Sequence, residues 1–171
     1  MIEAYQLALD EIKARYDITE FNVIGFSGGA AIAAILAAER EDVVSLRTVA
    51  GNLDHRAHSA HHEVSYMDES LDAPLYADKL VSIPQYHFIG DQDEIVPESV
   101  LHSYMQALGS DRCAQYKVVN NASHNEGWVN KWPDLLRLKT SCSRPAPQTD
   151  FGNFEPMPEP IYNAPDRPAK P

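Results

Sequence analysis

Apolar residues recur along this chain at two spacings, one typical of helices and one typical of buried strands. Apolar side chains three or four residues apart run from Ile2 to Tyr16, which predicts an amphipathic helix that begins at the first residue. Short apolar runs predict strands at 21–24, 43–50, 85–90 and 115–119. The pattern therefore predicts at least one helix and four strands.

Further helices are predicted between and after these strands, at 30–40, 97–108 and 127–138. Pro97 opens the second of them and Gly109 ends it, while Pro133 predicts a kink or a late start in the third. Alternating strands and helices predict an α/β fold with a mostly parallel sheet and flanking helices.

Two segments depart from this alternation. Residues 52–83 are polar and rich in histidine, with weak periodicity. Eight of the 12 prolines lie from Pro145 onward, so we expect 144–171 to be a disordered or extended tail. The predicted folded domain is therefore 1–143.

The composition of the chain argues against some classes of binding partner. The chain has 171 residues, enough for one domain with a sizeable core. Its formal net charge of -11 argues against binding to nucleic acid or to an anionic membrane. No apolar run approaches the roughly 20 residues that span a bilayer.

One pentapeptide contains a candidate catalytic serine. Gly25-Phe26-Ser27-Gly28-Gly29 lies directly between a predicted strand and a predicted helix. A serine on such a turn adopts a strained backbone, and we expect its neighbours to be small because other chain segments come close. The start of the following helix offers free N–H groups to a developing negative charge.

Two later loops offer partners for this serine. After the strand at 85–90 comes Gly90-Asp91-Gln92-Asp93-Glu94-Ile95-Val96-Pro97, and after the strand at 115–119 comes Asn120-Asn121-Ala122-Ser123-His124-Asn125. A serine hydroxyl is a weak nucleophile, so a histidine must take its proton and a carboxylate must orient that histidine. The alternatives are that the acidic residues cap the next helix and that His124 is a solvated loop residue.

In these three motifs the chain resembles the α/β-hydrolase superfamily, over nearly everything from Met1 to about Leu138. In that family a serine on the strand-to-helix turn, an acid and a histidine follow in this order. The resemblance implies Ser27 as nucleophile, Asp93 as the acid in a G-x-x-D-x-x-V-P pattern, and His124 as the base. It also implies that the N–H of Gly28 forms part of an oxyanion hole.

The resemblance is incomplete before Ser27. The family has further strands there and a loop with a second oxyanion donor, and neither is found in this sequence. We therefore expect the C-terminal portion of an α/β-hydrolase fold, with Met1 internal to a longer protein. The strand at 21–24 is then expected to be an exposed apolar edge.

Four histidines, His55, His58, His61 and His62, fall where the family places its lid insertion, so 52–83 is predicted to be lid-like. A solvated loop and a metal site are the alternatives, since imidazoles and carboxylates are metal ligands. His87 is predicted to lie in the core or on a sheet face, and His102 on the surface. Trp128 and Trp132, four residues apart on the last predicted helix, are expected to pack in the core.

Cys113 precedes the last strand and Cys142 follows the last helix, so both are expected at one edge of the sheet, where a disulfide is possible. If it forms, it implies a periplasmic or secreted protein; otherwise a cytoplasmic one is expected, with two reduced thiols.

The leading hypothesis is a serine hydrolase that cleaves small ester-type substrates through Ser27, Asp93 and His124, with no cofactor or metal. Carboxylesterase or lipase-like activity is the default, although peptidases, thioesterases and acyltransferases of this superfamily share the triad. The rivals are a catalytically incomplete binding module and a metal-binding protein built on 55–62.

Overall fold

The computed structural model describes residues 1–66 and 70–142. The tail predicted at 144–171 lies outside the described residues. Within them, four parallel strands form one sheet in the order β1-β2-β3-β4. The strands are β1 (Phe21–Phe26), β2 (Val43–Val49), β3 (Gln85–Gly90) and β4 (Ala114–Val119). The predicted α/β class with a parallel sheet is confirmed.

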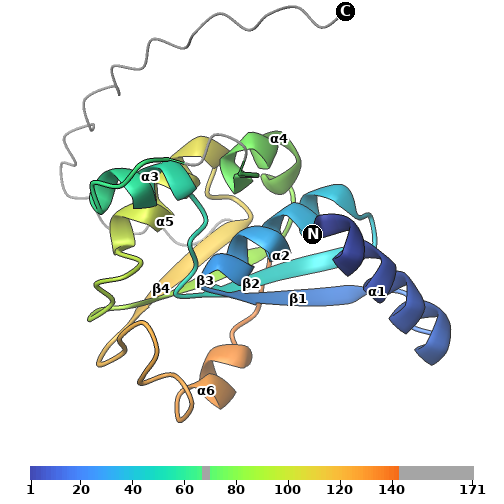
Figure 1. The fold of residues 1–171 in the computed structure, drawn as a ribbon. Helices are drawn as coiled ribbons and strands as arrows, with labels where there is room; N and C mark the ends of the chain where they lie inside the picture. Colours follow the sequence, from blue (N-terminus) through green and yellow to red (C-terminus); the bar gives the residue numbers. More distant parts are fainter. Residues whose placement is uncertain (67–69, 143–171) are drawn as a thin grey trace, which may run out of the picture.

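Helices connect the strands and cover both faces of the sheet. They are α1 (Ile2–Tyr16), α2 (Gly28–Glu39), α3 (His55–His61), the 3-10 helix η1 (Ala73–Tyr76), α4 (Ala77–Leu80), α5 (Glu98–Leu108) and α6 (Trp132–Leu136). Figure 1 shows α2, α3, α4 and α5 on one side of the sheet and α6 on the other. The carboxyl ends of the strands lie at one edge, where ligands bind in parallel α/β sheets.

Helix α2 lies close to the sheet because its contact side is made of alanines. Ala30, Ala34 and Ala37 are buried in the main core cluster, together with Leu46 of β2 and Tyr104 of α5. At Gly25 a Cβ would lie 2.5 Å from the Cα of Ala30, so a side chain there would push the helix away. The small residues thus allow the short distance between α2 and β1.

Segment 52–83 is more regular than its weak periodicity predicted. Its described part forms α3, η1 and α4, and η1 and α4 pack against α2 while α3 packs against α5. Asp54 caps α3 by accepting a hydrogen bond from the Ala57 N–H at 2.9 Å, and it accepts a second from Ser103 of α5 at 2.6 Å. These contacts anchor the segment to the domain; its role as a lid stays a prediction.

Helix α1 forms as predicted, but none of its residues is buried. It packs against α2, and Arg40 forms ion pairs with Asp10 of α1 and Asp42 at 2.8 and 2.7 Å. Hydrogen bonds from Arg40 and Lys13 lower the pKa of Asp42 to about 2. Charged contacts, as well as apolar packing, therefore hold this helix in place.

The last helix differs from its prediction. It begins at Trp132 and not at 127, with Pro133 in its first turn, so the late start indicated by the proline is correct. Trp128 is consequently outside the helix. Both tryptophans still pack in the core as expected, Trp128 as a buried member of a second core cluster and Trp132 against that cluster. The buried members of this second core cluster are Val49, Ala50, Phe88, Val119, Ala122, Trp128 and Leu135. Gly127, at φ 85°, turns the chain where the helix was predicted to begin.

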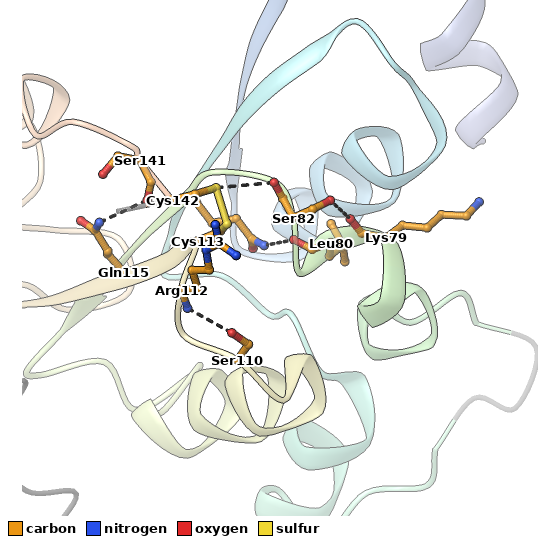
Figure 2. Close-up of a disulfide and its surroundings, with 10 residues drawn as sticks. Lys79, Leu80, Ser82, Ser110, Arg112, Cys113, Gln115, Ser141 and Cys142 are labelled. Carbon is orange, nitrogen blue, oxygen red and sulfur yellow. Dashed lines mark hydrogen bonds between the residues drawn. A yellow bond between two sulfur atoms is a disulfide. The ribbon is translucent and has the colours of Figure 1, made fainter. Parts of the chain in front are cut away.

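A disulfide closes the amino-terminal edge of the sheet. Figure 2 shows Cys113, just before β4, bonded to Cys142, which follows α6. Nearby, the Gln115 amide donates to the carbonyl of Ser141 at 3.4 Å. The predicted pairing of the two cysteines is thus present; the compartment inferred from it stays a prediction.

Strand β1 has no partner on its outer side within the described sheet. Ile24 and Phe26 on it are 48% and 46% exposed. A groove of about 280 Å³ lies beside this strand and is lined by apolar side chains of α1, β1 and α2. In the described residues, no helix is both long and apolar enough to cross a membrane.

Candidate active site

Ser27 occupies a sharp turn between β1 and α2. Its backbone has φ 51° and ψ −127°, a conformation that is costly for a residue other than glycine. The turn is held by hydrogen bonds from the Ser27 N–H to the Val49 carbonyl at 3.1 Å and from the Asn52 N–H to the Ser27 carbonyl at 3.0 Å. The strained serine is therefore fixed to the end of the neighbouring strand.

The glycines around Ser27 do not all have the role expected of them. At Gly25 a side chain would collide with α2, as described above. At Gly28 and Gly29, in contrast, an added Cβ would meet nothing within 4 Å, so the expected crowding there is wrong. Gly28 is the first residue of α2, and its N–H belongs to the helix-start donors that no intrahelical carbonyl accepts.

His124 reaches Ser27 from the loop after β4. Its Nε2 lies 2.9 Å from the Ser27 Oγ, although 97 residues separate the two in sequence. The histidine is only 8% exposed. The ring of Phe26 lies against it, with centroids 5.2 Å apart. Sequence reasoning missed this contact, since nothing in the pentapeptide shows where the Phe26 side chain points.

Asp93 lies behind the histidine, in the loop after β3. Its two carboxylate oxygens are 3.1 and 3.0 Å from the Nδ1 of His124. Oδ1 also accepts hydrogen bonds from the backbone N–H groups of Ile95 and Val96, at 3.0 and 2.8 Å. The Asp93 side chain is fully buried, so these donors replace the water that a carboxylate needs.

The neighbouring acidic residues point elsewhere. Glu94 is exposed, and Asp91 accepts a hydrogen bond from the N–H of Ala122 at 3.3 Å. Helix α5 has Pro97 as its N-cap and no capping side chain, so the alternative that this acidic cluster caps the helix finds no support. Of the three candidates, Asp93 is the one that meets His124.

The three side chains form a chain of hydrogen bonds suited to moving one proton. A buried carboxylate accepts from Nδ1–H, which leaves Nε2 of the neutral imidazole free to accept the proton of the serine. The three residues come from the loops after β1, β3 and β4 (Figure 1). This arrangement can generate a nucleophilic serine oxygen and can return the proton to a leaving group.

The four histidines of the 55–62 run lie on α3 and at its C-cap, His62. His58 and His62 lie with ring centroids 4.6 Å apart, and His61 and His62 at 4.9 Å. His62 Nε2 is 2.8 Å from the carbonyl of Ile95 in the loop that carries Asp93. Burial and the neighbouring His62 lower the pKa of His58. Among the described residues, no group of three or more His, Cys, Asp or Glu could hold a metal ion.

The other two histidines lie in different surroundings. His87 is buried in the sheet, as predicted, with Nδ1 2.8 Å from the hydroxyl of Thr48. Burial lowers the pKa of His87 to about 3, so this imidazole is neutral in the folded protein. His102, expected on the surface, is partly buried on α5 and lies 3.2 Å from Glu98.

Solved structures of α/β-hydrolases share this fold. An α/β-hydrolase enzyme from a sediment metagenome of the Mar Chica lagoon, Morocco, matches 79% of the chain with a TM-score of 0.59 and 14% identity, over 67% of its own length. A Pyrococcus furiosus esterase matches 78% with a TM-score of 0.61 and 16% identity, over 56% of its length. A serine hydrolase homologue from Coxiella burnetii matches 79% with a TM-score of 0.53 and 22% identity, over 53% of its length.

The chain thus spans between about half and two thirds of these structures. No curated protein matches the sequence. The family model described as serine hydrolase (FSH1) matches residues 12–118, a span that includes Ser27 and Asp93 and ends before His124. Since that match covers more than half of the sequence, the chain belongs to the FSH1 serine hydrolase family, and its fold is that of the α/β-hydrolases.

Proposed function

We propose that this chain hydrolyses ester-type bonds through Ser27, His124 and Asp93 by way of an acyl-enzyme. The observation that carries the proposal is the continuous set of hydrogen bonds from the Ser27 Oγ through both nitrogens of His124 to the Asp93 carboxylate. Membership of a serine hydrolase family supports the same chemistry. The likeness to an esterase from Pyrococcus furiosus agrees with an ester as the substrate class.

In the first step the Ser27 Oγ attacks the carbonyl carbon of the ester while its proton moves to the Nε2 of His124. The imidazolium that forms is stabilised by Asp93. The carbonyl oxygen gains a negative charge, and in this mechanism the N–H of Gly28 at the start of α2 donates to it. His124 then gives its proton to the alcohol oxygen as the carbon–oxygen bond breaks, which leaves Ser27 acylated.

In the second step a water molecule replaces the alcohol. His124 takes a proton from the water, the hydroxide oxygen attacks the acyl carbon, and the proton returns to the Ser27 Oγ as the acid departs. The reaction consumes one ester and one water and yields one acid and one alcohol. This chemistry uses the side chains of this chain and the substrate water.

A fluorophosphonate probe tests the nucleophile, because it phosphonylates an activated serine and needs no full turnover. We expect one adduct on the peptide that contains Ser27, and none in Ser27→Ala. Ser110→Ala is the matched control, since Ser110 lies near the opposite edge of the sheet, where its Oγ accepts from the Arg112 N–H. Undiminished labelling of Ser27→Ala, or an unlabelled wild-type chain, overturns the proposal.

A second assay tests the substrate class. p-Nitrophenyl esters with short and long acyl chains should give an acylated Ser27 peptide in quenched samples and a steady release of nitrophenol. A chain that is labelled by neither probe nor ester is better described by the rival hypothesis of a binding module. The outer side of β1, which is unpaired in the described sheet, and the apolar groove beside it support the hypothesis of a binding module.

A further inference from the structure

Trp128 makes a contact with the histidine loop that the proton relay does not explain. Its indole Nε1–H donates to two successive backbone carbonyls, to that of Ser123 at 2.9 Å and to that of His124 at 3.1 Å. The side chain is almost fully buried, at 8% exposure. This hydrogen bond joins a buried side chain directly to the main chain of His124.

The indole is held firmly on its other side. Trp128 belongs to the second core cluster, which also contains Val49, Phe88 and Leu135. Its own carbonyl accepts the N–H of Trp132 at 2.8 Å, at the start of α6. The donor is therefore anchored in this core cluster and at the start of α6, and not on the histidine loop alone.

The same cluster also supports the nucleophile. The carbonyl of Val49 accepts the Ser27 N–H at 3.1 Å, and Val49 packs in the cluster with Trp128. The main chain of Ser27 and the main chain of His124 are thus each hydrogen-bonded to a member of one core cluster. This common support links the two main-chain segments that carry the Ser27 Oγ and the His124 Nε2.

The loop between His124 and Trp128 is folded so that the indole can reach back. The N–H of Ser123 donates to the Glu126 carbonyl at 3.1 Å. Gly127 permits the return, because at this residue a Cβ would lie 2.2 Å from the carbonyl oxygen of Asn121. Lys131 Nζ donates to the carbonyls of Asn121 and Gly127 at 3.1 and 2.9 Å.

We propose that Trp128 is a positioning residue of the active site, whose indole N–H fixes the main chain of His124 and thereby its Nε2 at 2.9 Å from the Ser27 Oγ. The inference rests on the proposed function, since it gives Trp128 a role through His124. A displacement of about 1 Å at reacting groups can lower turnover about 10²-fold. Loss of the indole donor should therefore lower kcat about 10- to 100-fold, with KM changed less than about twofold.

The test compares Trp128→Phe with Trp132→Phe. Both substitutions remove an indole from the same cluster, and Trp132 touches Phe88 edge to face with centroids 6.1 Å apart. In the described part of the chain, Trp132 makes no side-chain hydrogen bond to the histidine loop. We expect the loss of kcat and of probe labelling rate in Trp128→Phe, and values close to those of the wild type in Trp132→Phe.

A spectroscopic measurement separates positioning from packing. The Nδ1–H of His124 that faces Asp93 should give a far-downfield proton resonance, assigned by its loss in Asp93→Asn. It should broaden or move in Trp128→Phe and persist in Trp132→Phe. This readout does not need turnover, so it tests the positioning role even if the wild-type chain hydrolyses no ester and the proposed function fails.

A third variant removes the hydrogen-bond donor while keeping the shape. Replacement of Trp128 by benzothienylalanine substitutes sulfur for the N–H in a ring of nearly the same size, so folding is preserved where phenylalanine fails. Loss of kcat and a moved resonance in this variant support the proposal. An unchanged resonance with unchanged kcat overturns it, as does an equal loss in Trp132→Phe.

Discussion

Asp93→Asn is the substitution that tests the proposed proton relay most directly. The amide has nearly the shape of the carboxylate, so the change alters charge and hydrogen-bonding direction without opening a cavity. In the native site, Oδ1 accepts from the Ile95 and Val96 N–H groups and both carboxylate oxygens face the Nδ1 of His124. An amide can satisfy these three donors only in part.

The N–H groups of Ile95 and Val96 determine the orientation of the new side-chain amide. They require an acceptor at the Oδ1 position, so the amide oxygen takes that place and its NH₂ group faces Nδ1. Nδ1 can then accept but not donate, and the imidazole proton moves to Nε2. A histidine that carries its proton on Nε2 cannot accept the Ser27 proton, so this tautomer should lower kcat about 10⁴-fold, equal to about 5.4 kcal/mol of activation free energy.

The assay is the rate of fluorophosphonate labelling and of p-nitrophenyl ester hydrolysis, with Glu94→Gln as the matched control. Glu94 is the next residue along the chain and is exposed, so its amide variant should keep wild-type rates. The free energy of unfolding of Asp93→Asn, measured with urea, should fall by only about 1 kcal/mol. A folded Asp93→Asn variant with rates within tenfold of the wild type would refute the reasoning.

Three further predictions concern stability and association. Reduction of the Cys113–Cys142 bridge, which closes a loop across 29 positions, should lower the free energy of unfolding in urea by about 3–4 kcal/mol; no change would contradict its cross-linking role. Burial lowers the pKa of His87 to about 3, so as the pH falls this histidine takes up a proton in the unfolded chain before it does so in the folded protein. The free energy of unfolding should therefore be highest above about pH 6.5 and should fall by about 1.4 kcal/mol per pH unit as the pH drops toward 3. His87→Gln should flatten this slope in urea titrations at several pH values, and an equal slope in both proteins would count against it. Ile24→Lys, at a 48% exposed position of the β1 edge, should lower light scattering from associated chains while leaving the probe labelling rate unchanged, and equal scattering would argue against association at this edge.

The parts of the fold that the sequence predicts well are those set by local chemistry. Pro97 and Gly109 mark the ends of α5 because a proline suits the start of a helix and a glycine tolerates the positive φ at its end, 64° here. The motifs at Ser27, Asp93 and His124 follow separate strands. Parallel strands bring their carboxyl ends to one edge, and the resemblance to the α/β-hydrolases assigned these three residues to one site there.

The parts that were missed depend on distant contacts. A helix was predicted from 127, with Trp128 and Trp132 four residues apart on it, but the indole of Trp128 turns back to the carbonyls of Ser123 and His124. A spacing pattern does not show that a polar ring atom has a partner upstream. Likewise, periodicity identified the apolar side of α1, yet no α1 residue is buried, because periodicity marks a face and not what covers it.

Burial differs among the three residues of the proposed relay in a way that suits their roles. The Asp93 side chain is fully buried and His124 is 8% exposed, whereas Ser27 is only partly buried. Exclusion of water strengthens the attraction between the carboxylate and the imidazolium that forms during attack. It also makes an unpaired carboxylate costly, and the N–H groups of Ile95 and Val96 offset that cost before any substrate arrives. The carboxylate of Asp93 therefore lies at the buried end of the three residues, and Ser27 lies at the accessible end, where the proposed reaction requires it to meet a substrate.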